Sequence, residues 1–475
     1  MKFKDLVIEN QILKIYFFFF IFFLFIFFIL SNIKIYNLRS TYYDLGFYLE
    51  YYSRLVDNDF NYLFNPNFQL SSILIYPFLK ILPLNYWLYF LIFFQSLCLS
   101  LPILFLKNNI YFICVYLLSS VLWFIALTDF HPDVLVVPIM FYLNKLSSAN
   151  KFNIKILFLL IIILSIKLVY IFLVFGYIIY FYFNKYNFNK NYVYLFLLFL
   201  FFYGYFYYIN VNIRDKYNII NLLNSIFILN NFFNIFSSKD VFLTIFVLCS
   251  SSAFLVFYNS KKLLIILPLL LFYFILPTDS YKKYYYHYYA PIFPIFIIIF
   301  IDVFDLFLKK YPFIYTKFLL IIIPIISNFI FSPSPISYSF LFSYKWAYEY
   351  KAYLIDHSIY LSRIKLNELV VAESKNKSIN VMIENNVFFT ELINRNIITQ
   401  VFPYNLKFND FDFIILKSLY PHYINDNICE DKYTFQCSNF DFITKYESYK
   451  KKTMINFSEL YKDKNIIILK NTKFR

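Results

Sequence analysis

The stretch Leu13–Leu30, LKIYFFFFIFFLFIFFIL, decides the fold class, because its eighteen residues carry a single charge. A helix of this length just crosses a hydrocarbon core of about 30 Å, at a rise of about 1.5 Å per residue. No small-residue cleavage site follows it, so we expect a retained signal anchor rather than a removed signal peptide. The chain therefore opens with a predicted membrane span.

Composition extends this interpretation to the whole chain of 475 residues. The hydrophobic fraction is 61% and the charged fraction 15%, against roughly 45–50% and about 25% in ordinary globular proteins. Three glycines and five cysteines exclude a fibrous repeat and a disulfide scaffold. The abundance of Phe, Tyr, Ile, Asn and Lys fits an AT-rich coding sequence, so the net charge of +15 does not indicate a nucleic-acid partner. The composition predicts a polytopic α-helical membrane protein whose partner is the lipid bilayer.

Ten further apolar runs bring the predicted number of transmembrane helices to eleven. These runs are Tyr86–Leu106, Ile110–Leu127, Val134–Leu146, Ile156–Ile166, Leu168–Phe183, Tyr192–Ile209, Val241–Tyr258, Leu263–Leu276, Ala290–Leu308 and Ile314–Ser332. The runs on either side of Lys151 are shorter than a full crossing needs. The segment Leu70–Leu82 is short and contains Pro77, and we expect an interfacial or re-entrant piece there.

Lysines indicate the orientation of these spans. If the N-terminus is cytoplasmic, every short inner connection carries lysine: Lys107; Lys145, Lys151 and Lys155; Lys185 and Lys190; Lys261 and Lys262; Lys309 and Lys310. The outer loop Thr128–Asp133 has two Asp and no Lys or Arg. This asymmetry follows the positive-inside rule. We expect a multi-pass protein of the cytoplasmic (plasma) membrane with its N-terminus inside and its C-terminal region outside.

The composition changes after about Pro333, where long apolar runs stop and polar residues increase. We expect a transmembrane domain at 1–332 and a small extracytoplasmic α/β domain at 333–475. A helix is predicted at Asn386–Arg395, and strands at Ser378–Ile383, Ile397–Phe402, Phe411–Leu416, Asp441–Lys445 and Asn465–Leu469. The domain contains no phosphate-binding glycine loop of the GxGxxG or GxxxxGK[ST] type.

The cysteines fall into two groups. Cys98, Cys114 and Cys249 lie within predicted spans and are interpreted as small packing residues. Cys429 and Cys437 are the pair in the C-terminal domain, and seven residues separate them. An oxidising exterior would let a disulfide between them persist. The alternative is two unrelated thiols.

Scarce polar residues fall on the predicted outer face. They are Asp44 and Glu50 in the first outer loop, Asp129, His131 and Asp133 between the third and fourth spans, Lys167 between the fifth and sixth, and Lys283 and His287 beside the tenth. Ionisable groups at membrane depth are costly and indicate function by default. Carboxylates can act as general bases or bind a divalent metal, and lysines can bind phosphate.

Each of these features also has a structural explanation. Asp44 and Gly46 can form a turn after the anchor, and Asp133 can cap the fourth span. Lys167 can extend toward the interface from a turn, and the tyrosines of 281–289 can form an aromatic belt. A zinc site is disfavoured, since two or three ligands without a Glu-x-x-His helix are too few.

Three short stretches together resemble a family of predicted membrane proteins, the domain of unknown function 2079 of the GT-C superfamily of membrane glycosyltransferases. They are Tyr43-Asp-Leu-Gly-Phe47, Asp129-Phe-His-Pro-Asp133 and His287-Tyr-Tyr-Ala-Pro-Ile-Phe-Pro294. A weaker similarity runs from Asn385 through Phe402-Pro403 to Asp412-Phe-Ile-Ile-Leu416. Each stretch is short, but their order along most of the chain is that of the family.

The chain departs from the family at two places. A His that is typical of the first outer loop is missing from Pro66-Asn-Phe-Gln69. The family's Lys-Glu-Asp corresponds to Lys167-Leu168-Val169, so acids that would support a metal-dependent mechanism are lost. These differences also fit a diverged, inactive member.

The resemblance implies inverting transfer of a sugar from a polyprenyl-phosphate donor to an extracytoplasmic acceptor. Asp44 matches the acid that deprotonates the acceptor, with Asp129, His131 and Asp133 in supporting catalytic roles. Lys167, Lys283, His287 and Glu50 are assigned to substrate or phosphate binding, and a divalent metal, Mg or Mn, is a candidate cofactor. The alternatives are a transporter or flippase for a lipid-linked or anionic solute, and a non-catalytic membrane scaffold.

Overall fold

The computed structural model describes residues 3–38, 45–56, 72–106, 109–147, 152–184, 197, 200, 204, 238–258, 261–276, 279–342, 353–384, 389–392, 396–402, 411–417 and 457–472. The chain divides into two compact units. Unit 1 comprises Met1–Ser31, Arg54–Ile81 and Phe90–Tyr350. Unit 2 comprises Asn32–Ser53, Leu82–Tyr89 and Lys351–Arg475. This division differs from a single boundary at 332/333, because two N-terminal segments group with the C-terminal residues.

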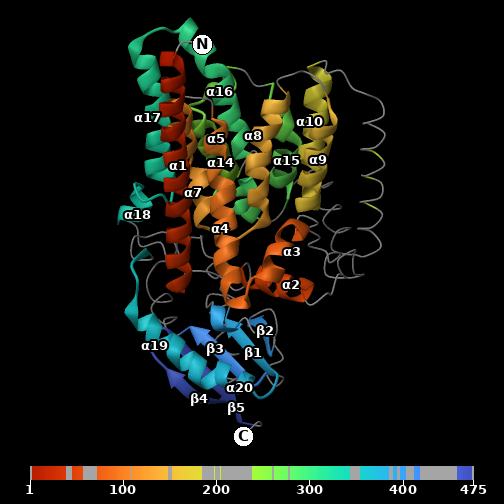
Figure 1. The fold of residues 1–475 in the computed structure, drawn as a ribbon, viewed down its shortest axis with the longest axis vertical. Coiled ribbons are helices and arrows are strands. Elements are labelled where there is room, and N and C mark those ends of the chain that lie inside the picture. Colours follow the sequence, from red (N-terminus) through yellow and green to blue (C-terminus); the bar gives the residue numbers. More distant parts are fainter. Residues whose placement is uncertain are drawn as a thin grey trace. The chain divides into compact units, whose positions relative to one another are not determined.

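The structure is mostly helical, as the sequence predicted, and many helices of unit 1 run along a common direction (Figure 1). The described helices are α1 (Phe3–Tyr36), α2 (Phe47–Val56), α3 (Ser72–Ile81), α4 (Trp87–Ser100), α5 (Pro102–Phe105), α6 (Ile110–Leu117), α7 (Ser120–Leu127), α8 (Val136–Ser147), α9 (Ile154–Ile166), α10 (Ile171–Phe183), α14 (Lys239–Ser251), α15 (Leu263–Ile275), α16 (Phe293–Lys310), α17 (Ile314–Phe331), α18 (Tyr338–Phe342), α19 (His357–Leu366) and α20 (Ala372–Ser374).

Three stretches of described helix are long and apolar enough to cross a membrane: Lys14–Tyr36, Leu84–Phe105 and His287–Lys310. The pair α6 and α7 makes a fourth if the two helices form one span, although they are bent by 57°. In α1, Phe17 and Phe18 are 57% and 63% exposed, whereas Phe27 is completely buried. Exposed Phe on an apolar helix suits contact with lipid, so the helices support a membrane protein.

The count of eleven spans stays a prediction. Several expected spans are helices of 12 or 13 residues, among them α8, α9, α10 and α15, and such a helix is only about 18–20 Å long. The expected span Val241–Tyr258 ends as an α-helix at Ser251, and positive φ angles at Ala253 and Phe254 follow. The expected span Tyr192–Ile209 lies almost entirely outside the described residues. The segment Leu70–Leu82 forms the short helix α3 with Pro77 inside it.

Helices α8 and α16 pack against each other and run in the same direction. Near their beginnings, His287 Nε2 lies 3.5 Å from Asp133 Oδ2. Toward their other ends, Lys262 pairs with Asp302 of α16 and donates a hydrogen bond to Asn144 of α8. The residues Asp133 and His287 therefore lie at one end of this helix pair and Lys262 near the other.

Helices α10 and α15 approach each other most closely at Gly176. A Cβ atom built on Gly176 would lie 2.0 Å from the carbonyl oxygen of Ile265 and 2.8 Å from that of Leu264. Small residues permit such backbone contacts between membrane helices. Glycine is therefore required at this position, and it fixes the packing of α10 on α15.

Unit 2 contains a five-stranded mixed sheet in the order β2-β1-β3-β5-β4. The strands are β1 (Ile379–Glu384), β2 (Ile397–Phe402), β3 (Phe413–Lys417), β4 (Phe457–Lys462) and β5 (Ile466–Asn471). β1 is parallel to β2 and β3, and β5 is antiparallel to β3 and β4. The predicted small C-terminal α/β domain is confirmed in this respect.

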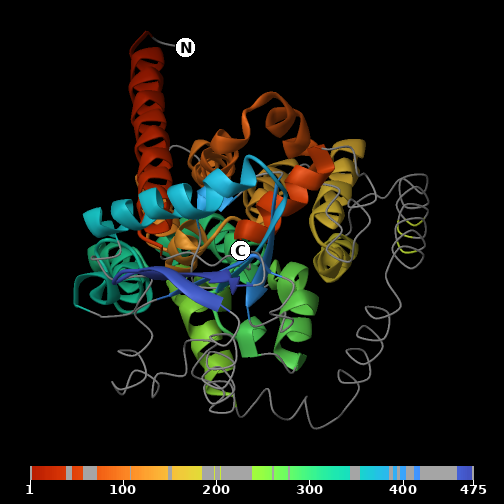
Figure 2. The ribbon, with the colours of Figure 1, turned by 90° about the horizontal axis from the view of Figure 1, so that it is seen from below.

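Helices α19 and α20 lie along one face of the sheet (Figures 1 and 2). Lys470 of β5 pairs with Glu373 of α20 at 2.8 Å. The buried side chains of Met382, Ile414 and Leu469 belong to an apolar core cluster of this unit. Burial on successive positions of β1, β3 and β5 agrees with a sheet covered on both faces.

The predictions for this domain were correct for β1, β2, β3 and β5 to within two residues. The predicted helix Asn386–Arg395 is described only at 389–392, where Thr390–Leu392 forms a single 3₁₀ turn. The predicted strand Asp441–Lys445 lies outside the described residues. Strand β4 and helix α19 were not predicted.

The C-terminal end of α1 belongs to unit 2 and is held by residues far along the chain. The Asn37 amide donates to the Leu354 carbonyl at 2.6 Å, and Asn37 Oδ1 accepts from the Asp356 amide at 3.2 Å. The Arg363 guanidinium donates to the Tyr36 carbonyl at 3.3 Å. Cationic donors suit the last carbonyls of a helix, so Arg363 stabilises this helix end.

Candidate functional site

The stretch Asp129–Asp133 connects α7 to α8 and lies inside unit 1, with Asp129, His131 and Asp133 all buried. Pro132 opens the 3₁₀ turn Pro132–Leu135, a position where its missing N–H leaves no bond unmade. The backbone N–H of His131 donates to Gln95 Oε1 at 3.3 Å. The Gln95 amide in turn donates to the Thr128 carbonyl at 3.1 Å. Gln95 of α4 therefore fixes the loop that carries His131 and Asp133.

The Asp133 carboxylate is 2% exposed and is contacted by three side chains from two other segments of the chain. Tyr170, at the start of α10, donates its hydroxyl to Oδ1. Lys167 Nζ lies 3.3 Å from Oδ2, and His287 Nε2 lies 3.5 Å from the same oxygen. Because these contacts link separate helices, Asp133 does not act simply as a helix cap. Lys167, which the sequence also allowed to be a surface lysine at a turn, pairs with this buried acid.

The imidazole rings of His131 and His287 stack, with centroids 3.4 Å apart and planes inclined by 12°. Two cationic rings would repel strongly at this separation, so at least one ring is neutral. Burial lowers the pKa of His131 well below its usual value, and His287 lowers it further, while Asp133 opposes the shift. A neutral imidazole keeps one nitrogen lone pair available as an acceptor or metal ligand.

The tyrosine-rich stretch 281–289 packs inside unit 1 beside this group, and every residue in it is buried or half-buried. Thr244 of α14 anchors the stretch: its hydroxyl donates to the Lys282 carbonyl at 2.6 Å and accepts from the Tyr284 amide at 3.0 Å. Lys167 Nζ lies 4.9 Å from the centroid of the Tyr288 ring. The stretch therefore positions His287 beside Asp133 and Tyr288 beside Lys167 rather than forming an exposed aromatic belt.

His131, Asp133 and His287 can together hold a metal ion. One ligand atom from each residue lies within 4.8 Å of the other two, and all three residues are buried. The sequence disfavoured zinc because two or three ligands without a Glu-x-x-His helix were too few. The fold brings His287 to His131 and Asp133. These three residues therefore support the general expectation that the chain can bind a metal ion.

The other assigned residues are not part of this group of three. Asp129 is buried in the same loop. Lys283 Nζ lies 3.9 Å from Asp240 Oδ2, and Glu50 lies in α2. Asp44, Cys429 and Cys437 lie outside the described residues, so the catalytic base and the disulfide stay predictions. Cys98, Cys114 and Cys249 are free, as expected for packing residues.

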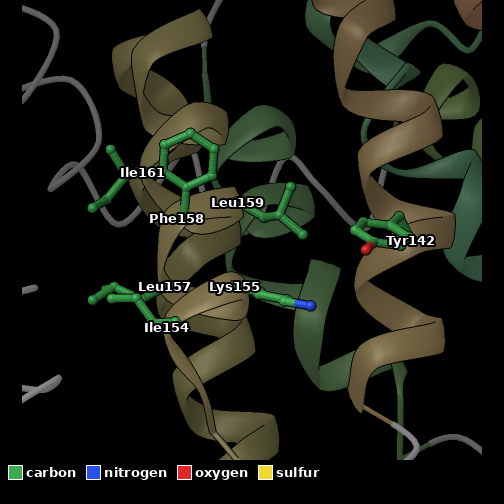
Figure 3. Close-up of a pocket in the computed structure, with 7 residues that line it drawn as sticks. All are labelled: Tyr142, Ile154, Lys155, Leu157, Phe158, Leu159 and Ile161. Carbon is green, nitrogen blue, oxygen red and sulfur yellow. The ribbon is translucent and has the colours of Figure 1, made fainter.

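A separate groove lies between α8 and α9, with a volume of about 480 Å³ (Figure 3). Its lining is mostly apolar, including Leu157, Phe158 and Ile161, and two polar side chains, Tyr142 and Lys155, contribute to it. Lys155 lies in the first turn of α9, whereas Lys167 follows its last residue. The groove is therefore distinct from the polar group around Asp133.

Sequence reasoning missed three side chains of the site: Gln95, Tyr170 and Tyr288. Gln95 carried a usable signal, because it is a strongly polar residue within the apolar helix Trp87–Ser100. Tyr170 and Tyr288 carried none, since the chain has 49 tyrosines. Their roles follow only from the contacts.

Chemically, the site combines two imidazole rings and a carboxylate, which can bind a cation, with an ammonium group, which can bind an anion such as phosphate. These groups lie among helices with apolar surfaces. Comparison of the chain with protein-family models, curated proteins and solved structures finds no match.

Proposed function

We propose that the chain is an inverting membrane glycosyltransferase of the GT-C type, which moves a sugar from a polyprenyl-phosphate donor to an extracytoplasmic acceptor. The observation that carries the proposal is the meeting of Asp133, Lys167 and His287 in one buried site. Two of the stretches behind the family resemblance, Asp129–Asp133 and His287–Pro294, contribute to that meeting. Distant stretches that share one buried polar site are better explained by a common chemical task than by three separate turns.

Each group has a role in this proposal. Lys167, with a divalent ion such as Mg or Mn at His131, Asp133 and His287, would neutralise the charge on the donor phosphate as the sugar leaves. Asp44 would accept the proton of the acceptor hydroxyl. Glu50 and Lys283 would bind the sugar or the lipid phosphate. The exposed apolar side chains of helices such as α1 and α17 suit a lipid environment for the donor.

The test uses purified full-length protein in proteoliposomes with a panel of labelled polyprenyl-phosphate monosaccharides. We expect consumption of one donor, with loss of about 10²–10⁴-fold in rate in Asp44→Asn and a comparable loss in Asp133→Asn. Asp305→Asn is the matched control, because Asp305 is exposed on α16. Donor consumption that is unchanged in both Asp44→Asn and Asp133→Asn would refute the proposal.

The orientation proposed from lysine placement is tested by cysteine labelling in a cysteine-free background. Asn376 and Lys310 are both exposed. A membrane-impermeant reagent added to intact cells should label Asn376→Cys in unit 2 and spare Lys310→Cys at the end of α16. The opposite pattern would place the C-terminal domain inside.

A transporter of a lipid-linked or anionic solute is the second candidate, and the broken helix pair α6–α7 favours it. Transporters commonly have interrupted helices beside their substrate, and α6 and α7 are bent by 57° at their break. An assay with labelled lipid in sealed vesicles distinguishes the transporter from the glycosyltransferase. Movement of the intact lipid across the bilayer would support transport, and cleavage of its sugar–phosphate bond would support the transferase.

A further inference from the structure

The atoms around Asp133 Oδ2 have the spacing of a metal site. His287 Nε2 lies 3.5 Å from this oxygen. One ligand atom each of His131, Asp133 and His287 lies within 4.8 Å of the other two. Ligand bonds of about 2.0–2.2 Å place neighbouring ligands roughly 3–3.5 Å apart in tetrahedral or octahedral geometry. We propose that His131, Asp133 and His287 bind one divalent transition-metal ion, and that this ion exchanges with the Lys167 ammonium at Asp133 Oδ2.

The donor set selects the class of metal. Two imidazole nitrogens and one carboxylate oxygen suit zinc, iron and other imidazole-binding ions, and the same trio with open positions is common in non-haem iron proteins. Magnesium prefers oxygen ligands and gives up water reluctantly. Of the two ions expected from the sequence, the site therefore suits manganese better than magnesium, and zinc better than either.

Two neighbours support the ligands as partners of metal ligands generally do. Tyr170 donates its hydroxyl to Asp133 Oδ1, which orients the carboxylate and leaves Oδ2 directed at His287. Gln95 Oε1 accepts a hydrogen bond from the backbone N–H of His131, and Gln95 Nε2 donates one to the Ile125 carbonyl near the end of α7. The carboxylate and the His131 backbone are therefore fixed without use of the proposed ligand atoms.

Lys167 is the cation that a metal must displace. Its Nζ lies 3.3 Å from Oδ2, and its side chain is 28% exposed, the most accessible of the charged groups here. The same Nζ already lies 4.9 Å from the Tyr288 ring centroid, within cation–π range. After displacement the ammonium retains this partner, and it becomes available to an incoming anion.

Metal binding must also change the histidine pair. While the rings stack at 3.4 Å with planes 12° apart, an ion shared between them lies about half that separation out of each plane. Nitrogen lone pairs lie in the ring plane, so both rings must tilt toward the ion. Cobalt(II) reports this step, since its visible absorption depends on the ligands and their geometry.

The experiment measures metal binding to purified full-length protein after treatment with a chelator, using Zn²⁺, Mn²⁺, Mg²⁺ and Co²⁺ alone. We expect one ion per chain, with zinc tighter than manganese and no competition from magnesium. His131→Ala and His287→Ala should each weaken binding by more than the roughly 10–100-fold typical of an outer-shell partner. The cobalt absorption should disappear in both variants.

Lys167→Met supplies the decisive measurement. Removing the competing charge should tighten zinc binding by roughly tenfold. Lys262→Met is the matched control, because Lys262 is 18% exposed and paired with Asp302, and it should leave zinc affinity unchanged. Circular dichroism and size-exclusion profiles establish that each variant is folded.

The inference concerns the same group as the proposed function but stands without it, since metal binding is measured with no substrate. No saturable binding by the wild type, zinc affinity unaltered in Lys167→Met, or equal competition by magnesium would overturn it. Metal binding without sugar transfer would refute the proposed glycosyltransferase function but not the metal site. Full sugar transfer by metal-stripped protein that binds no ion would refute only the metal site.

Discussion

Asp133 in unit 1 and Glu391 in unit 2 are two largely buried carboxylates that are held very differently. Both oxygens of Glu391 accept hydrogen bonds from Arg363 Nη1, at 2.8 and 2.7 Å, while Arg363 Nη2 donates to the Tyr36 carbonyl. The Arg363 guanidinium also lies over the rings of Tyr36 and Phe389 at 5.2 and 5.3 Å. At Asp133, by contrast, Lys167 and His287 share one oxygen at 3.3 and 3.5 Å.

The difference separates a structural ion pair from a candidate binding group. Hydrogen bonds between an ionised donor and an ionised acceptor are short and about twice as strong as neutral ones, and the two bonds from Arg363 reach both oxygens of Glu391. The contacts of Lys167 and His287 with Asp133 Oδ2 are long, so a ligand that binds this oxygen more strongly can replace them. Contact geometry distinguishes the two centres, whereas burial alone does not.

The largest effect on stability is expected from Arg363→Ala in unit 2. The change leaves Glu391 without its ion-pair partner and removes a donor to the Tyr36 carbonyl, which should cost on the order of 3 kcal/mol. Proteolysis of unit 2 in the full-length protein should become about a hundredfold faster. Arg363→Lys keeps the charge but loses the two rigidly held nitrogens that donate to Glu391 and to the Tyr36 carbonyl, so its proteolysis rate should lie between those of wild type and Arg363→Ala. Proteolysis at the wild-type rate in both variants would contradict a structural role.

Asp133→Asn should cost much less, about 1 kcal/mol. Asparagine keeps the shape and can still accept from Tyr170, and Lys167 keeps its contact with Tyr288. Thermal unfolding of full-length protein in detergent provides the comparison. A loss as large as that of Arg363→Ala would make Asp133 a structural carboxylate as well, and the contrast would fail.

Acid should weaken unit 2 through Glu373. Burial acts to raise the Glu373 pKa, but hydrogen bonds and charges from Lys470 and Lys377 outweigh it, and the pKa is lowered. The stabilisation is therefore present above the unfolded-state value of 4.5 and is lost as the pH falls through the lower folded value. Pepsin sensitivity between about pH 5 and 3 should rise less steeply in Glu373→Gln than in wild type; parallel curves would argue against the linkage.

The smallest effect is expected from Glu368→Gln. Glu368 pairs with Lys365 at 2.7 Å, but their side chains are 53% and 46% exposed. Such pairs typically contribute about 0–1 kcal/mol, so the proteolysis rate should match wild type. A tenfold acceleration would mean that exposed pairs matter in this unit as much as buried ones.

Elements with a strong local pattern could be predicted from the sequence. The run Leu13–Leu30 became part of the long helix α1, and the apolar strands β1, β3 and β5 were expected nearly where they lie. Strand β4 was missed because most of its residues are half-buried or exposed, which leaves no apolar run. The break between α6 and α7 was missed because Ser119 and Ser120 interrupt an otherwise apolar run without lowering its hydropathy much.

The site could be predicted only in parts. His131, Asp133, Lys167 and His287 stood out as scarce polar residues, but their meeting depends on the packing of α8, α10 and α16. No local pattern relates His287 to Asp133. The argument against zinc counted the ligands of one stretch and so did not include His287, a candidate ligand that the fold supplies.

The contacts of Asn37 and Arg363 at the C-terminal end of α1 also determine when, during synthesis, this helix end can acquire its partners. The Asn37 partner, the carbonyl of Leu354, comes 317 residues later, so a ribosome adding about 5–20 residues per second needs roughly 15–60 s to reach it. The first helix is therefore made well before the residues that bind its C-terminal end. A chain that stops before Leu354 lacks the carbonyl that accepts from Asn37.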